Sequence, residues 1–277
     1  MSAISVRGLR KSYGEHEAVR GIDFEIAVGE VFGLLGPNGA GKTTTIEILE
    51  GYRSRTAGEV EVLGADPQRA GRAWRERIGV VLQSSSLYPT LTVRESLRTF
   101  GGYYTRSRPV DEVVEIVGLE EKADARVRTL SGGQKRRLDL GLALVGDPEL
   151  IFLDEPTTGF DPGARRTAWE TIRNLRSLGK TILLTTHYLD EAEQLADRVA
   201  VLRAGEIVSE GKPSELTGAV AETEIRFRRN GSVVVERTAT PTERLHELIH
   251  EFGGTEIDGL EVRRATLEDI YLELTEE

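Results

Sequence analysis

The first third of the chain alternates between apolar and polar positions in short runs. Residues 4–35 follow this pattern and end in a continuous apolar run, Val31–Leu35. Alternation is typical of a half-buried strand, and a short unbroken apolar run of a strand buried on both faces. A glycine-rich loop follows, and then a helical pattern over about 42–50. The β-branched runs Glu59–Leu63 and Ile78–Leu82 predict two more strands.

The middle of the chain changes to helical spacing, which predicts an inserted α-helical subdomain over about 84–147. Thr92 and Glu95 form a capping box at the start of an amphipathic stretch. Apolar residues over Val110–Val117 recur at helical spacing, and Gly118 ends this run.

Strand patterns return after this region and are separated by helices. The expected strands are Leu150–Leu153, Thr181–Thr185 and Val199–Leu202, with helices at 164–177 and 189–196 between them. Strands that alternate with helices imply a mostly parallel sheet. Together with the early strands, the pattern predicts an α/β fold with a mixed sheet core.

The pattern changes again near the Gly-Lys-Pro segment at 211–213. We expect one domain over 1–215 and a small α+β appendage over 216–277. Asn230-Gly231 is a strong signal for a tight hairpin turn. The elements expected in the appendage are strands at Glu224–Phe227 and Val233–Glu236, a helix at 242–252, a strand at Ile257–Val262 and a last helix from Thr266.

Composition and charge exclude several classes of protein. The 277 residues include no Cys, which excludes disulfides, thiolate metal sites and a Cys nucleophile. The formal net charge is −10, and residues 221–277 contribute −7 of it. Because an acidic chain binds a phosphate backbone poorly, we expect no nucleic-acid partner. The chain has neither the roughly 18-residue apolar run of a membrane span nor the apolar segment of a signal peptide, so we expect it to start out in the cytoplasm.

The loop after Val31–Leu35 fits the phosphate-loop pattern G-x-x-x-x-G-K-[ST], known as Walker A. Glycines let backbone N–H groups approach phosphate oxygens, and the following helix adds the positive end of its dipole. Lys42 is expected to neutralise the β- and γ-phosphates, and the Thr43 hydroxyl to bind Mg²⁺. A glycine-rich turn with an incidental lysine is the alternative, but the flanking strand and helix favour an NTPase. The loop consists of Gly36, Pro37, Asn38, Gly39, Ala40, Gly41, Lys42, Thr43 and Thr44.

Two carboxylates follow the apolar run Leu150–Leu153, in the manner of a Walker B motif. Asp154 at the end of the strand can hold Mg²⁺. Glu155 would then lie beside the γ-phosphate, where it can orient and deprotonate the attacking water. Solvated acids at the end of a strand are the alternative, and the phosphate loop in the same chain makes the catalytic interpretation the better one.

A third motif, Leu130–Gln134, opens a helix that runs to about Val145. Ser131 is a natural N-cap, and the helix N-terminus after it would form a second anion-binding surface on the same chain. A simple capped helix is the alternative. The motif lies between the phosphate loop and the carboxylates, 23 residues before Asp154, and this order favours ligand binding. The residues concerned are Ser131, Gly132, Gly133 and Gln134.

With these motifs in this order, residues 1 to about 215 resemble the ATP-binding-cassette (ABC) family, and Leu130–Gln134 matches its signature motif. The resemblance implies that Tyr13 stacks on adenine. It implies that Gln83 reports on Mg²⁺ and on the membrane partner. Asp161 lies in a segment that resembles the D-loop, although Gly159-Phe160 departs from the commoner Ala-Leu, and His187 resembles the H-loop histidine.

The resemblance also implies a mechanism. Two such chains would stack head to tail with two ATP molecules between them, so that Walker A of one chain and Ser131–Gln134 of the other contact the same nucleotide. The implied catalytic residues are Lys42, Glu155 and His187, with Thr43, Gln83 and Asp154 around Mg²⁺. A symmetric dimer would also explain why one chain carries two anion-binding surfaces.

The finer resemblance is to ATPases of the ABC-2 type, including daunorubicin-resistance and multidrug exporters. It is carried by Leu130–Leu138, Thr185–Glu193 and Thr266–Leu274. It implies a separate transmembrane permease subunit and a peripheral location on the cytoplasmic face of the cell membrane. A soluble ABC ATPase of iron–sulfur cluster assembly is the alternative. A nucleic-acid or ribosome-associated ABC ATPase fits less well, because the chain has one Walker A motif, no Cys and no long heptad run.

Overall fold

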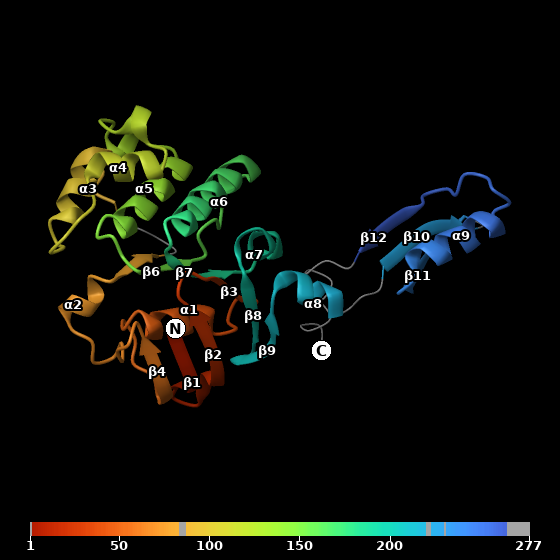
Figure 1. Ribbon diagram of the computed structural model, residues 1–277, viewed down its shortest axis with the longest axis horizontal. Helices are drawn as coiled ribbons and strands as arrows, with labels where there is room; N and C mark the ends of the chain where they lie inside the picture. The colour runs from red at the N-terminus through yellow and green to blue at the C-terminus, as the bar shows by residue number, and fades with distance from the viewer. Residues whose placement is uncertain (1, 83–86, 220–222, 230, 265–277) are drawn as a thin grey trace. The chain divides into compact units, whose positions relative to one another are not determined.

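Figure 1 shows the computed structural model of the chain, coloured from its N-terminus to its C-terminus. The structure describes residues 2–82, 87–219, 223–229 and 231–264. Contacts within the chain divide it into two compact units, Met1–Glu210 and Gly211–Glu277. The change of pattern along the sequence predicts this division a few residues later, after residue 215.

An antiparallel sheet begins the first unit (Figure 1). β1 (Ser2–Tyr13) pairs with β2 (His16–Ala27) on one edge and with β4 (Ala57–Val62) on the other, which gives the order β2-β1-β4. Alternate residues of β2, such as Ile22, Phe24 and Ile26, are buried, as the alternating pattern predicts. The sheet brings Tyr13 to the end of β1, next to the turn into β2.

A second sheet of six strands forms the centre of the first unit, in the order β5-β6-β7-β3-β8-β9. The pairs β5–β6, β6–β7, β7–β3 and β3–β8 are all parallel, so the predicted α/β architecture is confirmed. Every residue of β3, β6 and β7 is buried, which explains the apolar runs Val31–Leu35, Leu150–Leu153 and Ile182–Leu184 in these strands. The strands are β3 (Val31–Leu35), β5 (Ile78–Val81), β6 (Leu150–Asp154), β7 (Thr181–Thr186), β8 (Arg198–Arg203) and β9 (Glu206–Gly211).

Parallel strands bring the segments that follow them to one edge of the sheet. The segments after β3, β6 and β7 therefore meet, although they are far apart in the sequence. The helices that follow these three strands are α1 (Lys42–Leu49), α6 (Pro162–Ser177) and α7 (Leu189–Leu195).

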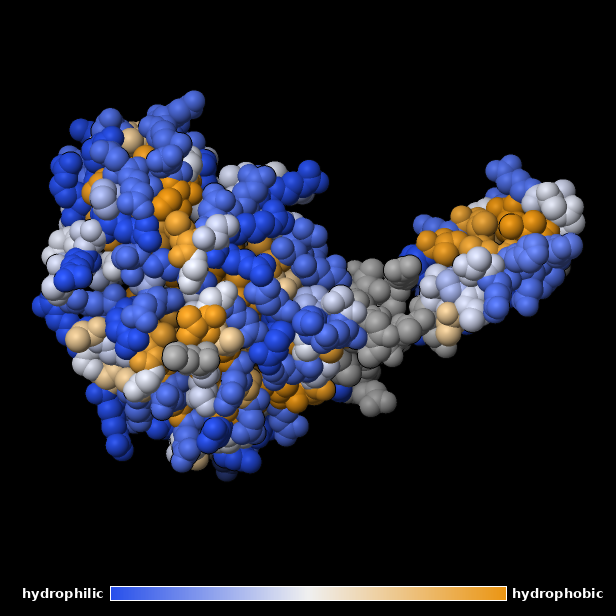
Figure 2. All heavy atoms as spheres, in the orientation of Figure 1, coloured by the Kyte–Doolittle hydropathy of each residue, from blue (hydrophilic) through white to orange (hydrophobic). Residues whose placement is uncertain are grey.

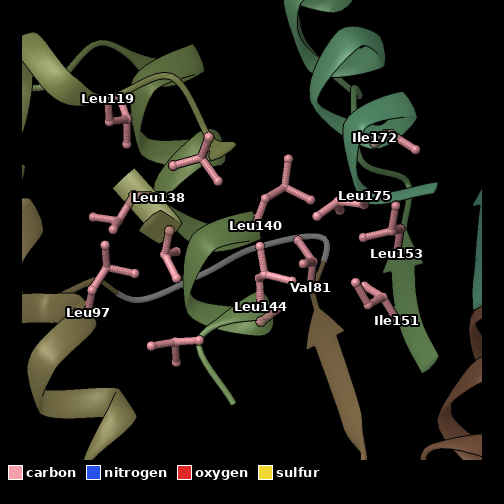
Figure 3. Close-up of a cluster of buried hydrophobic side chains, with 14 of the residues drawn as sticks. Val81, Leu97, Leu119, Leu138, Leu140, Leu144, Ile151, Leu153, Ile172 and Leu175 are labelled. Carbon is pink, nitrogen blue, oxygen red and sulfur yellow. The ribbon is translucent and has the colours of Figure 1, made fainter. Parts of the chain in front are cut away.

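Helices α3 (Val93–Gly101), α4 (Val110–Ile116) and α5 (Gly132–Leu144) fill the middle of the chain, as predicted. Thr92 caps α3 in the expected capping box with Glu95. Figure 3 shows leucines of α5 between α3, α6 and strands β5 and β6, in one buried cluster. Shorter elements are α2 (Arg72–Arg75) and the 3₁₀ turns η1 (Glu120–Lys122) and η2 (Val127–Thr129).

The second unit is a small antiparallel sheet with helices, ordered β11-β10-β12. Arg229 pairs with Ser232 across the expected hairpin turn, although Asn230 itself lies outside the described residues. Ile225, Phe227 and Leu248 form its buried core. The elements are α8 (Pro213–Ala219), β10 (Thr223–Arg229), β11 (Ser232–Thr238), α9 (Pro241–Glu251) and β12 (Glu261–Arg264).

The prediction of a strand over Ile257–Val262 is wrong in its position. β12 begins only at Glu261, because Ile257 is buried against the core and Gly259 turns the chain with a φ of 64°. The Asp258 carbonyl accepts a hydrogen bond from the amide of Arg228 at 2.8 Å. The helix expected from Thr266 lies outside the described residues.

The surface of the first unit is mainly polar on the face that Figure 2 shows, with small apolar patches between charged side chains. No helix in the described ranges is both long enough and apolar enough to span a bilayer.

Candidate functional site

The loop between β3 and α1 can be built only with glycine at two of its positions. A Cβ atom on Gly36 would lie 2.3 Å from the Leu202 carbonyl oxygen, and one on Gly41 would lie 2.5 Å from the Ala18 carbonyl oxygen. Gly41 also has a φ of 105°, which L side chains rarely adopt. The loop therefore packs tightly between β2 and the end of β8 and is held in one conformation.

Helix α1 begins directly after this loop, and no described side chain caps its N-terminus. Its N-cap is Gly41, and within the described chain no acidic residue lies in its first turn. The first amides of a helix have no partner inside the helix, so they are available to an anion. This arrangement fits a bound phosphate group.

The side chain of Lys42 lies over the loop that precedes it. Its Nζ donates hydrogen bonds to the carbonyl oxygens of Gly36 at 2.8 Å and Pro37 at 3.2 Å, and lies 3.5 Å from Glu155 Oε1. Burial lowers the pKa of Lys42, while the negative charges of Glu155 and Asp154 oppose this shift. The site therefore holds a buried cation that already interacts with anionic and carbonyl oxygens.

Asp154 at the end of β6 lies beside the start of α1. Its Oδ2 is 3.4 Å from the Thr43 hydroxyl, and its Oδ1 accepts a hydrogen bond from the Thr185 hydroxyl at 2.5 Å. Burial raises the pKa of Asp154, and the hydrogen bond from Thr185 opposes that shift. A carboxylate and a hydroxyl at this spacing suit Mg²⁺, which takes one or two protein oxygens and completes its shell with phosphates and water.

The side chain of Glu155 contacts several neighbours in the site. The Thr158 hydroxyl donates to its Oε2 at 3.1 Å, and His187 Nδ1 lies 3.4 Å from its Oε1. Burial by itself raises the pKa of Glu155, but the charge of Lys42, with Thr158 and His187, outweighs burial and leaves this pKa below its ordinary value. The carboxylate is therefore ionised and able to accept a proton.

The Ser131–Gln134 segment lies at the N-terminus of α5. The Ser131 hydroxyl accepts from the Gln134 amide at 3.3 Å, and the Ser131 amide donates to Gln134 Oε1 at 2.9 Å, which completes the predicted cap. Ser131 and Gly132 are exposed. Among the described residues, no hydrogen bond or ion pair joins this segment to the Gly36–Thr44 loop of the same chain. The fold of one chain thus keeps the two anion-binding surfaces separate.

The remaining predicted site residues take different places. Tyr13 is 41% exposed, with Lys11 Nζ 5.0 Å and the Arg53 guanidinium 5.3 Å from its ring centre, so its ring is accessible at the surface. Asp161 caps α6 by accepting from the amides of Gly163 and Ala164. Gln83 lies outside the described residues.

The comparisons with known proteins decide the family. The ABC transporter family model matches residues 19–158. The chain is 43% identical to Nod factor export ATP-binding protein I of Paraburkholderia xenovorans (strain LB400), over 99% of this chain and 97% of that protein. The chain belongs to the ABC transporter family.

Solved structures of ABC ATP-binding cassettes have the same fold. A cassette in its ADP conformation matches with a TM-score of 0.69 and 25% identity, covering 78% of this chain and 92% of that one. A dimeric post-hydrolysis cassette bound to ADP and Pi matches with a TM-score of 0.67 and 27% identity, covering 76% and 98%. The chain is accordingly the ATP-binding subunit of an ABC transporter and an ATP hydrolase.

The ABC ATPase also has a groove that extends away from its Walker residues. This cavity of about 950 Å³ begins at Thr43 and Asp154 and reaches the aromatic side chains of Phe100 and Tyr104. Glu50 lies in it, and burial raises the pKa of Glu50 to about 8, with the charges of Asp154 and Glu47 adding to the shift.

Sequence reasoning missed three residues of the ABC site. Thr185 holds both Asp154, through its hydroxyl, and the amide of Glu155. Thr158 holds the carboxylate of Glu155. Arg136 of α5 is buried and donates to main-chain carbonyls around Glu155. A polar residue at the end of a buried strand is a usable signal for Thr185, whereas the helical pattern around Arg136 contains none.

Proposed function

We propose that this chain is the ATP-hydrolysing subunit of an ABC-2-type exporter and that it works with a separate transmembrane permease. The observation that carries this proposal is the 43% identity, over 99% of the chain, to a protein named as an export ATP-binding protein. The sequence signals at Leu130–Leu138 and Thr185–Glu193 point to the same branch of the family. This similarity favours export over the iron–sulfur alternative.

The permease, and not this chain, determines which compound the exporter carries. The relatives carry the name Nod factor export, while the sequence motifs resemble those of multidrug exporters. Both the name and the motifs indicate outward transport, and ATP hydrolysis by this chain powers it.

The chain acts as a head-to-tail dimer that closes on two ATP molecules. Two features support this proposal: Ser131 and Gly132 are exposed at the start of α5, and this surface makes no bond to the Walker A loop of its own chain within the described ranges. A similar cassette is a dimer bound to ADP and Pi. A closed symmetric dimer lets each surface serve the partner's nucleotide.

Each residue of the site has a role in hydrolysis under this proposal. Lys42 and the amides of α1 bind the β- and γ-phosphates, and Tyr13 stacks on the adenine. Thr43 and Asp154 hold Mg²⁺, which neutralises phosphate charge. Glu155 takes the proton of the attacking water, and His187 holds the carboxylate of Glu155 in place.

The permease docks into the groove that reaches from Asp154 to Phe100 and Tyr104. Apolar and aromatic side chains at one end, and the Mg²⁺ ligands at the other, suit a surface that transmits nucleotide state. This contact keeps the chain on the cytoplasmic face of the membrane, where ATP is present.

The decisive experiment uses Glu155→Gln, which keeps the shape of the side chain and removes its basicity. Hydrolysis falls by about 10²–10⁴-fold, and ATP shifts the protein from monomer to dimer in size-exclusion chromatography. Adding Ser131→Arg abolishes the shift, because it blocks the opposing surface. A variant that hydrolyses ATP at the parental rate refutes the role of Glu155. An inactive variant that stays monomeric refutes the dimer.

The exporter role has its own test. Affinity purification of the full chain from its native membranes recovers a multi-span membrane protein, and Ser131→Arg does not prevent this. Recovery of a soluble iron–sulfur scaffold in its place would support the alternative function.

A further inference from the structure

The backbone at Glu155 is in an unusual conformation. Glu155 has a φ of 45°, in the left-handed region that residues other than glycine rarely adopt. Its amide donates to the carbonyl oxygen and the hydroxyl of Thr185, at 3.2 and 3.0 Å. A left-handed residue persists only where its surroundings hold it there. The contacts of Thr185 hold the amide side of Glu155, and the carbonyl side needs a second support.

Arg136 supplies that support. Its Nη2 donates to the carbonyl oxygens of Asp154 at 3.1 Å and Glu155 at 3.5 Å, and its Nε donates to that of Pro156 at 3.0 Å. One guanidinium thus holds three successive carbonyl groups centred on the left-handed residue. Its Nη1 donates to the Leu82 carbonyl, next to the end of β5.

Arg136 is placed for this role by a rigid helix. It is only 7% exposed, and in the described chain its hydrogen bonds all end on main-chain oxygens. Leu138, Leu140 and Leu144 of the same helix are buried in the cluster of Figure 3, which fixes α5 against the sheet. The planar fork of a guanidinium can bridge several acceptors at once, whereas the ammonium of lysine is a point charge.

From this geometry we infer that Arg136 is a positioning residue for ATP hydrolysis, which holds the backbone of Glu155 so that its carboxylate meets the attacking water. Arg136 lies two residues after Gln134, so the helix that begins at the signature motif also holds the catalytic segment. The inference rests on the proposed role of Glu155 as general base. Arg136 acts by holding the backbone in place, and no covalent bond to it forms or breaks during hydrolysis.

The test compares Arg136→Met and Arg136→Lys with the same changes at Arg137. Arg137 is a matched control, since it is the next residue of α5 and its Nη1 also donates to carbonyl oxygens, those of Val117 and Gly118. For the purified full chain, we measure kcat, KM for MgATP and the melting temperature. We expect Arg136→Met to lower kcat by about 10- to 100-fold with little change in KM, because a small misplacement of a catalytic group has such an effect.

The lysine variant and the control separate positioning from stability. Arg136→Lys recovers part of kcat, since it keeps the charge and one donor nitrogen, and both Arg137 variants keep the parental kcat. If Arg136→Met does not fold, the kcat of Arg136→Lys tests the inference in its place. A parental kcat in the Arg136 variants overturns the inference, as does an equal loss at Arg137. So does failure of both Arg136 variants to fold while the Arg137 variants fold.

A double-mutant cycle with Glu155→Gln shows whether Arg136 acts through Glu155. If it does, adding Arg136→Met to Glu155→Gln causes no further loss of the residual rate. If Arg136→Met lowers the rate by the same factor in Glu155→Gln as in the parent, Arg136 acts elsewhere, which overturns the inference. If Glu155→Gln retains the parental rate, the proposed function of Glu155 fails as well. If Glu155→Gln is inactive and Arg136→Met is not, only the present inference fails.

Discussion

Lys42 Nζ and Glu155 Oε1 lie 3.5 Å apart, and both side chains are buried, with exposed fractions of 4% and 8%. The two side chains to which we assign phosphate binding and proton transfer therefore form an ion pair inside the protein. A γ-phosphate competes with Glu155 for Lys42, because both are anionic ligands of the same ammonium group. We therefore expect ATP binding to release Glu155 from Lys42 and to leave its carboxylate free to accept a proton from water.

Competition for Lys42 predicts that Glu155→Gln tightens ATP binding. The change removes the negative charge that pairs with Lys42 and leaves the loop amides and Asp154 in place. To separate this effect from dimer formation, both proteins carry Ser131→Arg, and calorimetry measures the Kd for MgATP. A Kd equal to that of the Ser131→Arg parent would show that the ion pair does not oppose ATP.

Removal of the cation has the opposite effect. Lys42→Ala deletes the ammonium group that reaches the phosphates and costs at least about 1.5–3 kcal/mol of binding free energy. Isothermal calorimetry should then detect no tight MgATP binding. Lys122→Ala is the control, because Lys122 lies on the exposed η1 turn. Unchanged ATP affinity in Lys42→Ala contradicts the assignment of the phosphate loop.

The raised pKa of Glu50 predicts that stability falls as the pH rises from about 4.5 to about 8. Its pKa of about 8 in the folded protein lies above the ordinary value of 4.5, mainly because of burial. The folded state therefore favours the protonated form, and this contribution is complete below pH 4.5 and is lost as the pH rises to about 8. Glu50→Gln stays neutral, so it should unfold at higher urea concentrations than the parent near pH 9 and at similar ones near pH 5.

The Glu50 measurement is made in EDTA without nucleotide, so that no cation at Asp154 changes the pKa of Glu50. Glu121→Gln, at an exposed position of η1, serves as the control and should show no such difference. Equal pH profiles for the parent and Glu50→Gln would contradict the raised pKa.

Two loop glycines predict different losses of stability. Alanine at a left-handed position costs about 1–2 kcal/mol of unfolding free energy. Gly39 has a φ of 83° and nothing within 4 Å of an added Cβ, so Gly39→Ala pays only this cost. Gly41→Ala should lose more, because its Cβ would also lie 2.5 Å from the Ala18 carbonyl oxygen. Urea denaturation of both variants measures the free energy of unfolding. Equal losses of this free energy in the two variants would contradict the packing described for the loop.

Thr185→Val tests the support beneath Asp154 and Glu155. The change keeps the shape of the side chain and removes the hydroxyl that bonds to both residues. Leaving a buried acceptor without its partner costs about 1–3 kcal/mol of stability, and kcat should fall as well. In the control Thr171→Val, the lost hydroxyl donates to the Thr167 carbonyl within α6, away from Asp154 and Glu155 in the described structure. A parental kcat in Thr185→Val would show that the hydroxyl does not position the site.

The parts of the site that sequence reasoning predicted are those encoded in short segments. The strand, loop and helix around Lys42 follow one another directly, so the local pattern contains the whole motif. The caps at Thr92 and Ser131 are equally local, since each bonds to a residue three positions away. The prediction of a strand that begins at Ile257 was wrong. Its apolar residues match a strand pattern, but Ile257 is buried against the core and Gly259 turns the chain before the strand begins.

Periodicity and motif order are properties of neighbouring residues, so the amino-acid pattern was enough to predict the α/β fold, the loop around Lys42 and the carboxylates of Asp154 and Glu155. The meeting of Lys42, Glu155 and His187 depends on long-range folding, because the parallel order of β3, β6 and β7 brings the ends of distant strands to one edge. Long-range folding also brings Arg136 to the backbone of Glu155. A buried guanidinium is recognised by its acceptors, and those lie at or just beyond the ends of β5 and β6, 18 residues and more away along the chain.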